Sequence, residues 1–202
     1  MGFVIVIALA LYLLISMGVI AWAIRHAKKS GKSTLRWGWG AALAMYLLVF
    51  WDWIPTVVAH KYYCDTQAGF WVYKTPEQWK QENPGVMETL ISNKGQVSKS
   101  VGDNNNFIDT NYMNQRFIYV NKHHGPLWFN RWRHEQEIID GKTNDTIARE
   151  VNFSTSQERR QAGWSGWKFW LDSGFAGNRN CNTYVHRDSG GLSPIALQLQ
   201  GK

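Results

Sequence analysis

Two long apolar runs occupy the first sixty residues of the chain. No Asp, Glu, Lys, Arg or His lies between Met1 and Ile24, and the second run, Trp37 to Ala59, contains a single charge, Asp52. A helix rises about 1.5 Å per residue, so about 20 residues cross the hydrocarbon core of a bilayer. The pattern therefore predicts two membrane spans, over about residues 3–25 and 37–59.

The segment between the two runs, residues 25–36, contains basic residues and no acidic ones: Arg25, Lys28, Lys29, Lys32 and Arg36. A cleaved signal peptide carries its basic residues before the apolar stretch, not after it, so we expect the first helix to be retained. The positive-inside rule places such a loop in the cytoplasm. We therefore expect a two-pass protein of a bacterial inner membrane with both termini in the periplasm.

Beyond His60 the long apolar runs give way to short segments, and residues 61–202 are an ordinary length for one domain. Residues 70–74 are rich in aromatic and β-branched side chains and predict a strand. Thr75-Pro76-Glu77 predicts the start of a short helix, with a cap, a proline in the first position and an acid in the first turn. Pro84-Gly85 ends that helix, and residues 86–92 could form one or two further turns.

The strongest strand signals lie between residues 111 and 153. A strand core at 116–120 is expected to stop at 123–126, and segments 127–139 and 146–153 flank a turn at 140–144. Trp128 and Trp132 alternate with Arg131 and Arg133, which is typical of a strand with one buried face. We predict a membrane-anchored α+β fold: a transmembrane hairpin over 1–60, then a periplasmic domain over 61–202 with three to four antiparallel strands and one or two short helices.

Composition sharpens this division of the chain. The 202 residues are 45% hydrophobic with a net charge of +7, yet the mean hydropathy of −0.34 suggests an ordinary soluble protein. Residues 61–202 hold 17 Lys and Arg against 14 Asp and Glu, so most of the excess charge lies in the short loop between the spans. Anionic lipid headgroups are the expected counter-charge for that loop, and we expect no nucleic-acid partner.

Cys64 and Cys181 are the two cysteines of the chain, and both fall in the outer domain. Two cysteines on the outer side of a bacterial inner membrane usually pair. We expect a disulfide that ties the C-terminal segment to the end of the second span. The alternative is two free thiols, although no CxxC motif indicates redox catalysis.

Asp52 and Pro55 are a candidate interaction feature near the outer end of the second span. A carboxylate in hydrocarbon is costly and often functional, but near the headgroups a solvated or capped Asp52 is also possible. Pro55 has no N–H to donate to the carbonyl of Trp51, so a kink is expected there.

Small residues at a spacing of four, Gly38 with Ala42 and Gly40 with Ala44, allow close approach of another helix. That helix could be the first span of the same chain or a foreign subunit. The spacing alone does not choose between them.

Trp164, Trp167 and Trp170 lie in an unusually aromatic segment, 163–170. Burial in the core is one interpretation, since a tryptophan covers a large area and needs one hydrogen bond. The other is an aromatic platform for a sugar ring, a lipid or a partner protein. Both remain open from the sequence.

We expect no metal, cofactor or catalytic site. The neighbouring His123 and His124 cannot point the same way on one strand, and the sequence contains no HExxH, GxSxG or glycine-rich phosphate loop. A zinc site would need three or four converging ligands.

A short segment resembles a stretch in uncharacterised proteobacterial envelope proteins. It comprises Tyr63-Cys64, Gly69 and Val72-Tyr73-Lys74-Thr75, about 14 residues from first to last. The resemblance implies a bacterial envelope location and carries no activity.

The features together favour a non-catalytic accessory or interaction subunit of an inner-membrane complex, with the bilayer and integral membrane proteins as partners. Two alternatives fit the same features. One is a membrane-anchored immunity or exclusion protein, and the other is a periplasmic sensor that binds glycan or another ligand through Trp164, Trp167 and Trp170.

Overall fold

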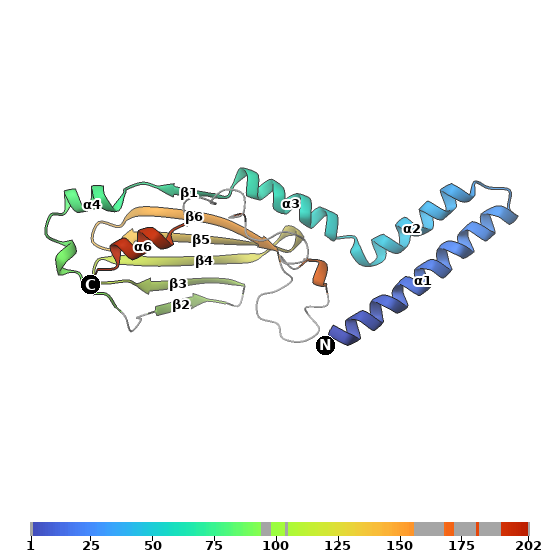
Figure 1. The fold of residues 1–202 in the computed structure, drawn as a ribbon, viewed down its shortest axis with the longest axis horizontal. Coiled ribbons are helices and arrows are strands. Elements are labelled where there is room, and N and C mark those ends of the chain that lie inside the picture. Colours follow the sequence, from blue (N-terminus) through green and yellow to red (C-terminus); the bar gives the residue numbers. More distant parts are fainter. Residues whose placement is uncertain are drawn as a thin grey trace. The chain divides into compact units, whose positions relative to one another are not determined.

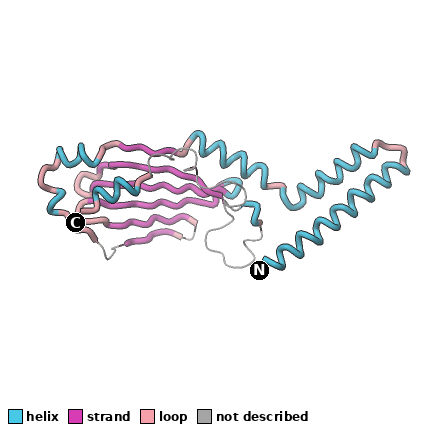
Figure 2. The backbone as a smooth tube through the Cα atoms, in the orientation of Figure 1, coloured by secondary structure: helices cyan, strands magenta, loops and turns pink. Residues whose placement is uncertain are grey.

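The computed structural model describes residues 2–93, 98–103, 105–155, 168–171, 181 and 191–201. The chain divides into two compact units, Met1–Pro55 and Thr56–Lys202. The first consists of helices and the second is built on a β-sheet, as Figures 1 and 2 show.

The first unit contains two antiparallel helices, α1 (Gly2–Lys29) and α2 (Thr34–Phe50). They pack closely where side chains are small: Ala23 and Ala27 are buried, and a Cβ on Gly38 would lie 3.2 Å from Ile24 of α1. Gly40 differs, because no atom in its surroundings comes within 4 Å of its Cβ position. Of the two glycines in the small-residue pairs, Gly38 is therefore the one that packs against α1 of the same chain.

Among the described residues, one helix is by itself long and apolar enough to cross a membrane, Phe3–Lys29, whose most apolar 18-residue window has a mean hydropathy of 2.9. The expected second span falls on two helices, α2 and α3 (Trp53–Thr66), bent by 62° at the break between them, and the pair is long and apolar enough to cross only if it is taken as one span. Pro55 lies in the first turn of α3, where it has no N–H to donate to a preceding carbonyl. The expected kink is therefore a complete break.

The described strands of the second unit form one antiparallel sheet of six, in the order β1-β6-β5-β4-β3-β2. Their bounds are β1 (Gly69–Val72), β2 (Ser98–Gly102), β3 (Asn106–Tyr112), β4 (Phe117–Leu127), β5 (Arg131–Asp140) and β6 (Asp145–Thr155). The sequence predicts three to four strands, near β1, β4, β5 and β6, and misses β2 and β3. Every residue of β2 is exposed, so its sequence carries no alternating apolar signal.

Strand β4 runs four residues further than the pattern predicts, through His123-His124-Gly125-Pro126. The register between β4 and β5 shifts between His124 and Leu127. Gly125 is buried there, and a Cβ on it would lie 2.9 Å from the ring of Trp132. A glycine in this strand therefore makes room for a tryptophan of the neighbouring strand.

Two short helices cover one face of the sheet, which we call the core face. Trp79 of α4 (Pro76–Glu82) and Leu199 of α6 (Ser193–Leu199) pack with Phe117, Ile138 and other buried apolar residues of the strands. Figure 1 shows α6 lying over the sheet.

The start of α4 is as predicted, with a capping box between Thr75 and Gln78, whereas α6 lies in a segment for which the sequence pattern predicts no helix. Short 3-10 turns occur at Met87–Thr89, Trp128–Asn130 and Phe169–Leu171.

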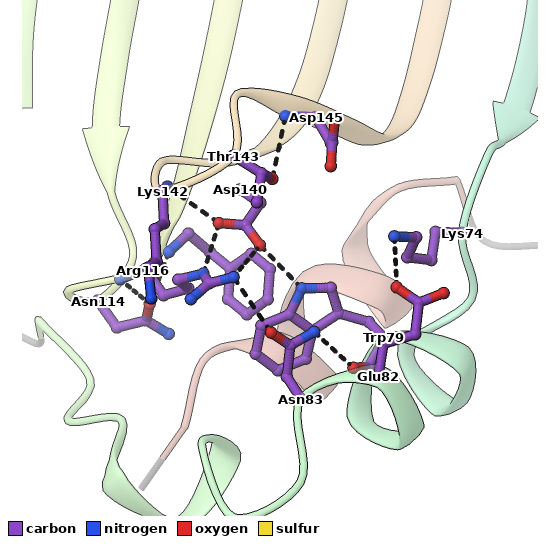
Figure 3. Close-up of polar contacts among 11 residues, drawn as sticks. Lys74, Trp79, Glu82, Asn83, Asn114, Arg116, Asp140, Lys142, Thr143 and Asp145 are labelled. Carbon is purple, nitrogen blue, oxygen red and sulfur yellow. Dashed lines mark hydrogen bonds and ion pairs between the residues drawn. The ribbon is translucent and has the colours of Figure 1, made fainter.

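A buried carboxylate joins α4 to the β5–β6 hairpin. Asp140 accepts hydrogen bonds from Trp79 Nε1 at 2.9 Å, from the Nε and Nη2 of Arg116, and from the backbone N–H of Lys142 at 3.0 Å (Figure 3). Asp140 is 2% exposed. Burial alone would raise its pKa, but the hydrogen bonds from Arg116 and Trp79 outweigh burial and lower it.

Replacing Asp140 by Asn should cost about 3 kcal/mol of unfolding free energy at neutral pH, since it leaves Arg116 without its charged partner. A lowered pKa contributes stability that is present above the unfolded value, about 3.9, and is lost as the pH falls through the folded value. The difference between Asp140→Asn and the parent should therefore shrink below about pH 4. Urea unfolding of the full chain in detergent, followed by near-UV circular dichroism, measures it. Glu82→Gln, which removes an exposed ion pair with Lys74, is the control and should change little; equal losses in the two variants would contradict the assignment.

Candidate functional site

A disulfide joins α3 to the C-terminal part of the chain. The bond links Cys64 of α3 to Cys181, with Cα atoms 5.2 Å apart and a sequence separation of 117. Both side chains are buried, at 5% and 1% exposed. This is the pairing that the sequence predicts, and it fastens Cys181 beside strand β6, where its N–H donates to the side chain of Asn152 at 2.8 Å.

The surroundings of the disulfide are apolar and aromatic. Val151 and Phe153 of β6 pack against the two cysteines, together with the partly buried Tyr63 and Ala68. We call the disulfide and these residues the α3–β6 junction. Because β1 begins three residues after the end of α3 and pairs Gly69 with Val151, the junction also positions the edge strand β1.

An arginine stacks on the junction. The guanidinium carbon of Arg131 lies 3.3 Å from the centre of the Tyr63 ring and 5.6 Å from that of Phe153. Arg131 is only 8% exposed, so the cation–π contact is largely desolvated, where such contacts are strongest. Sequence reasoning did not identify Arg131 or Tyr63 as partners, since one begins β5 and the other lies in α3.

His60 adds a metal-ligating side chain to the junction. It lies one helical turn before Cys64, with Nε2 3.4 Å from Cys64 Sγ, and the ligand atoms of His60, Cys64 and Cys181 all lie within 4.8 Å of one another. Zinc binds cysteine as the thiolate, and the disulfide occupies both sulfurs. These residues could therefore hold a metal only if the bond were reduced.

The two neighbouring histidines separate as the strand alternation requires. His123 stacks on Phe107, whereas His124 is exposed. His123 Nδ1 lies 2.8 Å from His134 Nδ1, and His134 Nε2 lies 2.6 Å from Ser154 Oγ. His123, His134 and Ser154 therefore form a row of side chains across three strands, along which a proton can pass. The sequence analysis did not predict this row, and we assign it no activity.

The face of the sheet opposite the core carries a network of ion pairs, which we call the charged face. Glu135 contacts Arg149 and Arg133 at 2.8 Å each and Lys122 at 3.4 Å, and Glu137 contacts Lys122 at 2.6 Å. Burial alone would raise the pKa of Glu135, but the nearby Arg149, Lys122 and Arg133 lower it. Glu135 is therefore held ionised and paired, on a face that leaves Lys122, Arg133 and Arg149 about one third exposed.

A groove of about 480 Å³ borders the charged face where β1 ends beside the β5–β6 hairpin. Its lining is polar: Tyr73, Lys74, Glu137, Asp145, Thr146 and Arg149. Tyr73 is 59% exposed and hydrogen-bonds Arg149, whose pKa is raised by Glu135 and Glu137 against the lowering effect of its own burial. A groove lined in this way suits a polar peptide or protein surface better than an apolar ligand.

The other candidate residues lie in other segments of the chain. Asp52 is 2% exposed and lies with Pro55 at the break between α2 and α3. Trp170 lies in the turn Phe169–Leu171 and is 2% exposed, so its ring is interior. Trp164 and Trp167 lie outside the described residues.

The sequence analysis identified no motif on the core face or on the charged face. Burial of Tyr119 on the core face, reinforced by Glu150, raises its pKa to about 12, so its hydroxyl stays protonated and donates to Gln136 at 2.9 Å.

No family model, curated protein or solved structure matches the chain, and none of these comparisons therefore indicates a catalytic activity.

Removing the disulfide should destabilise the second unit by about 4–5 kcal/mol in the chain-entropy model, because the bond closes a loop of more than one hundred residues. Cys64→Ala, Cys181→Ala and the double variant should lose similar amounts, since either substitution removes the same bond. Urea unfolding of the full chain measures the loss. His124→Ala changes an exposed side chain and serves as the control, and a double variant as stable as the parent would contradict a structural role.

Proposed function

We propose that the chain is a non-catalytic accessory subunit of a bacterial inner-membrane complex, and that its second unit is the part that contacts the other subunits. One observation carries the membrane assignment. The most apolar 18-residue window of the helix Phe3–Lys29 has a mean hydropathy of 2.9, and only 6% of that window is buried by the rest of the chain. A helix that is apolar all round and uncovered requires lipid or another membrane protein around it.

The proposed topology has two passes. Helix α2 has 17 residues, which corresponds to about 26 Å, close to the roughly 30 Å of hydrocarbon. The basic loop after α1 favours the cytoplasm, so α2 would emerge on the periplasmic side near its break with α3. A buried disulfide in the second unit supports this side, because such bonds persist in oxidising compartments.

The charged face supports an interaction role for the second unit. Its ion pairs leave Lys122, Arg133 and Arg149 about one third exposed, whereas Glu135 and Glu137 are largely covered. Such a surface fits a polar protein partner by charge complementarity, which sets specificity and orientation. Tyr73 is the aromatic residue at the groove, and exposed tyrosines of this kind frequently anchor interfaces.

Purification from native membranes in a mild detergent tests the proposal. The tagged chain should bring down at least one integral membrane protein in a fixed ratio. Tyr73→Ala should reduce that recovery by about tenfold, because losing an interface anchor costs more than 1 kcal/mol.

Tyr112→Ala is the matched control, since Tyr112 is a partly exposed tyrosine of β3, away from the groove, and recovery should not change. A monodisperse chain with no accompanying protein would overturn the proposal. Equal recovery with both variants would place the contact elsewhere than the groove.

A further inference from the structure

The connection between β4 and β5 presents apolar side chains to the outside. It comprises Leu127–Asn130, which we call the tip. Trp128 is 84% exposed, the largest fraction among the large apolar residues that the structure describes, and Phe129 beside it is 39% exposed. A tryptophan presented in this way contributes nothing to the core of its own domain.

The backbone of the tip is held in an unfavourable conformation. Phe129 has φ 59° and ψ 43°, and Asn130 has φ 54°. Asparagine tolerates this left-handed region, but for a bulky aromatic residue it is an outlier. Such strain persists where the surroundings fix it, and it is concentrated at functional positions.

The tip lies at the end of the sheet where α3 enters the second unit. Arg131, the first residue of β5, pairs with Thr155 at the end of β6 and stacks on Tyr63 of α3. From Tyr63 back to Thr56 the helix covers about 10 Å, and the tip projects beyond Arg131 at the same end. The β5–β6 turn lies at the opposite end, with α4 (Figure 1).

The sequence flanking the tip contains basic residues and no acidic ones. Residues 122–134 contain no Asp or Glu and include Lys122, Arg131 and Arg133 with three histidines. Arg131 is 8% exposed and stacks on Tyr63, whereas Lys122 and Arg133 pair with Glu135 and keep more than a third of their side chains exposed. An exposed tryptophan is typical of the boundary between headgroups and hydrocarbon.

We propose that the tip rests in the headgroup region of the same bilayer that anchors the chain, with Trp128 at the boundary between headgroups and hydrocarbon. The proposal depends on the membrane anchoring proposed above. Five residues lie between Phe50, the last residue of α2, and Thr56, and the six steps from one to the other reach at most about 20 Å. The end of the second unit that carries the tip is therefore tethered close to the membrane surface.

A spin label tests this contact in the full chain. Neither Cys64 nor Cys181 is free, so Trp128→Cys supplies one reactive thiol for a nitroxide. Lys142→Cys places the same label in the exposed β5–β6 turn at the opposite end of the sheet, as the matched control. Both proteins are reconstituted in phosphatidylethanolamine–phosphatidylglycerol vesicles, and collisions with oxygen are compared with collisions with a water-soluble nickel chelate.

The nitroxide at position 128 should collide more with oxygen than with nickel, and the nitroxide at position 142 should show the reverse. Equal access of both labels to nickel would overturn the proposal, because the tip would then lie in water. A label at position 128 shielded from both reagents would also overturn it, in favour of a protein contact.

Failure of the anchoring itself gives a separate signal. A chain that does not anchor is released from the vesicles by an alkaline wash, whereas an anchored chain with its tip in water stays bound. The two failures are therefore distinguishable in the same samples.

Discussion

The attachment of α3 to strand β6 is the constraint on which the second unit depends. Cys64 is covalently bound to Cys181 there, and Tyr63 contacts both Arg131 and Phe153. Strand β1 follows α3 almost immediately, so the same contacts determine how the edge of the sheet pairs. Any force transmitted along the chain from the proposed membrane helices would reach the sheet first at this point.

The sheet is fixed at its other end by a different interaction, the buried Asp140 between Arg116 and Trp79. Both ends are therefore secured by residues far apart in sequence. This arrangement leaves the two faces free to differ: the core face is covered by α4 and α6, and the charged face carries ion pairs. The proposed roles follow this division, with the groove beside the charged face for a polar partner and the apolar tip for lipid.

Local signals explain which parts of the fold are predictable from the sequence. The capping box at Thr75 depends on neighbours in sequence and is found as predicted. The predicted alternation of buried tryptophans and exposed arginines holds for Trp132, which is buried, but is wrong for Trp128, which lies in a 3-10 turn and is 84% exposed, and for Arg131, which is 8% exposed. Cys64 and Cys181 could be paired because the chain offers no other cysteine. Strand β2 escapes prediction because it is exposed on both faces, and the stacking of Arg131 on Tyr63 escapes it because two distant elements create it. The break at Asp52 was foreseen only as a kink, since Pro55 marks its place but not its angle.

The side of the membrane on which the second unit lies is the claim most directly open to measurement. In cells whose outer membrane is permeabilised and whose inner membrane is intact, a membrane-impermeant maleimide reaches periplasmic thiols only. The proposed topology predicts full labelling of the Lys142→Cys variant before the inner membrane is opened. Labelling that occurs only after the inner membrane is lysed would contradict it.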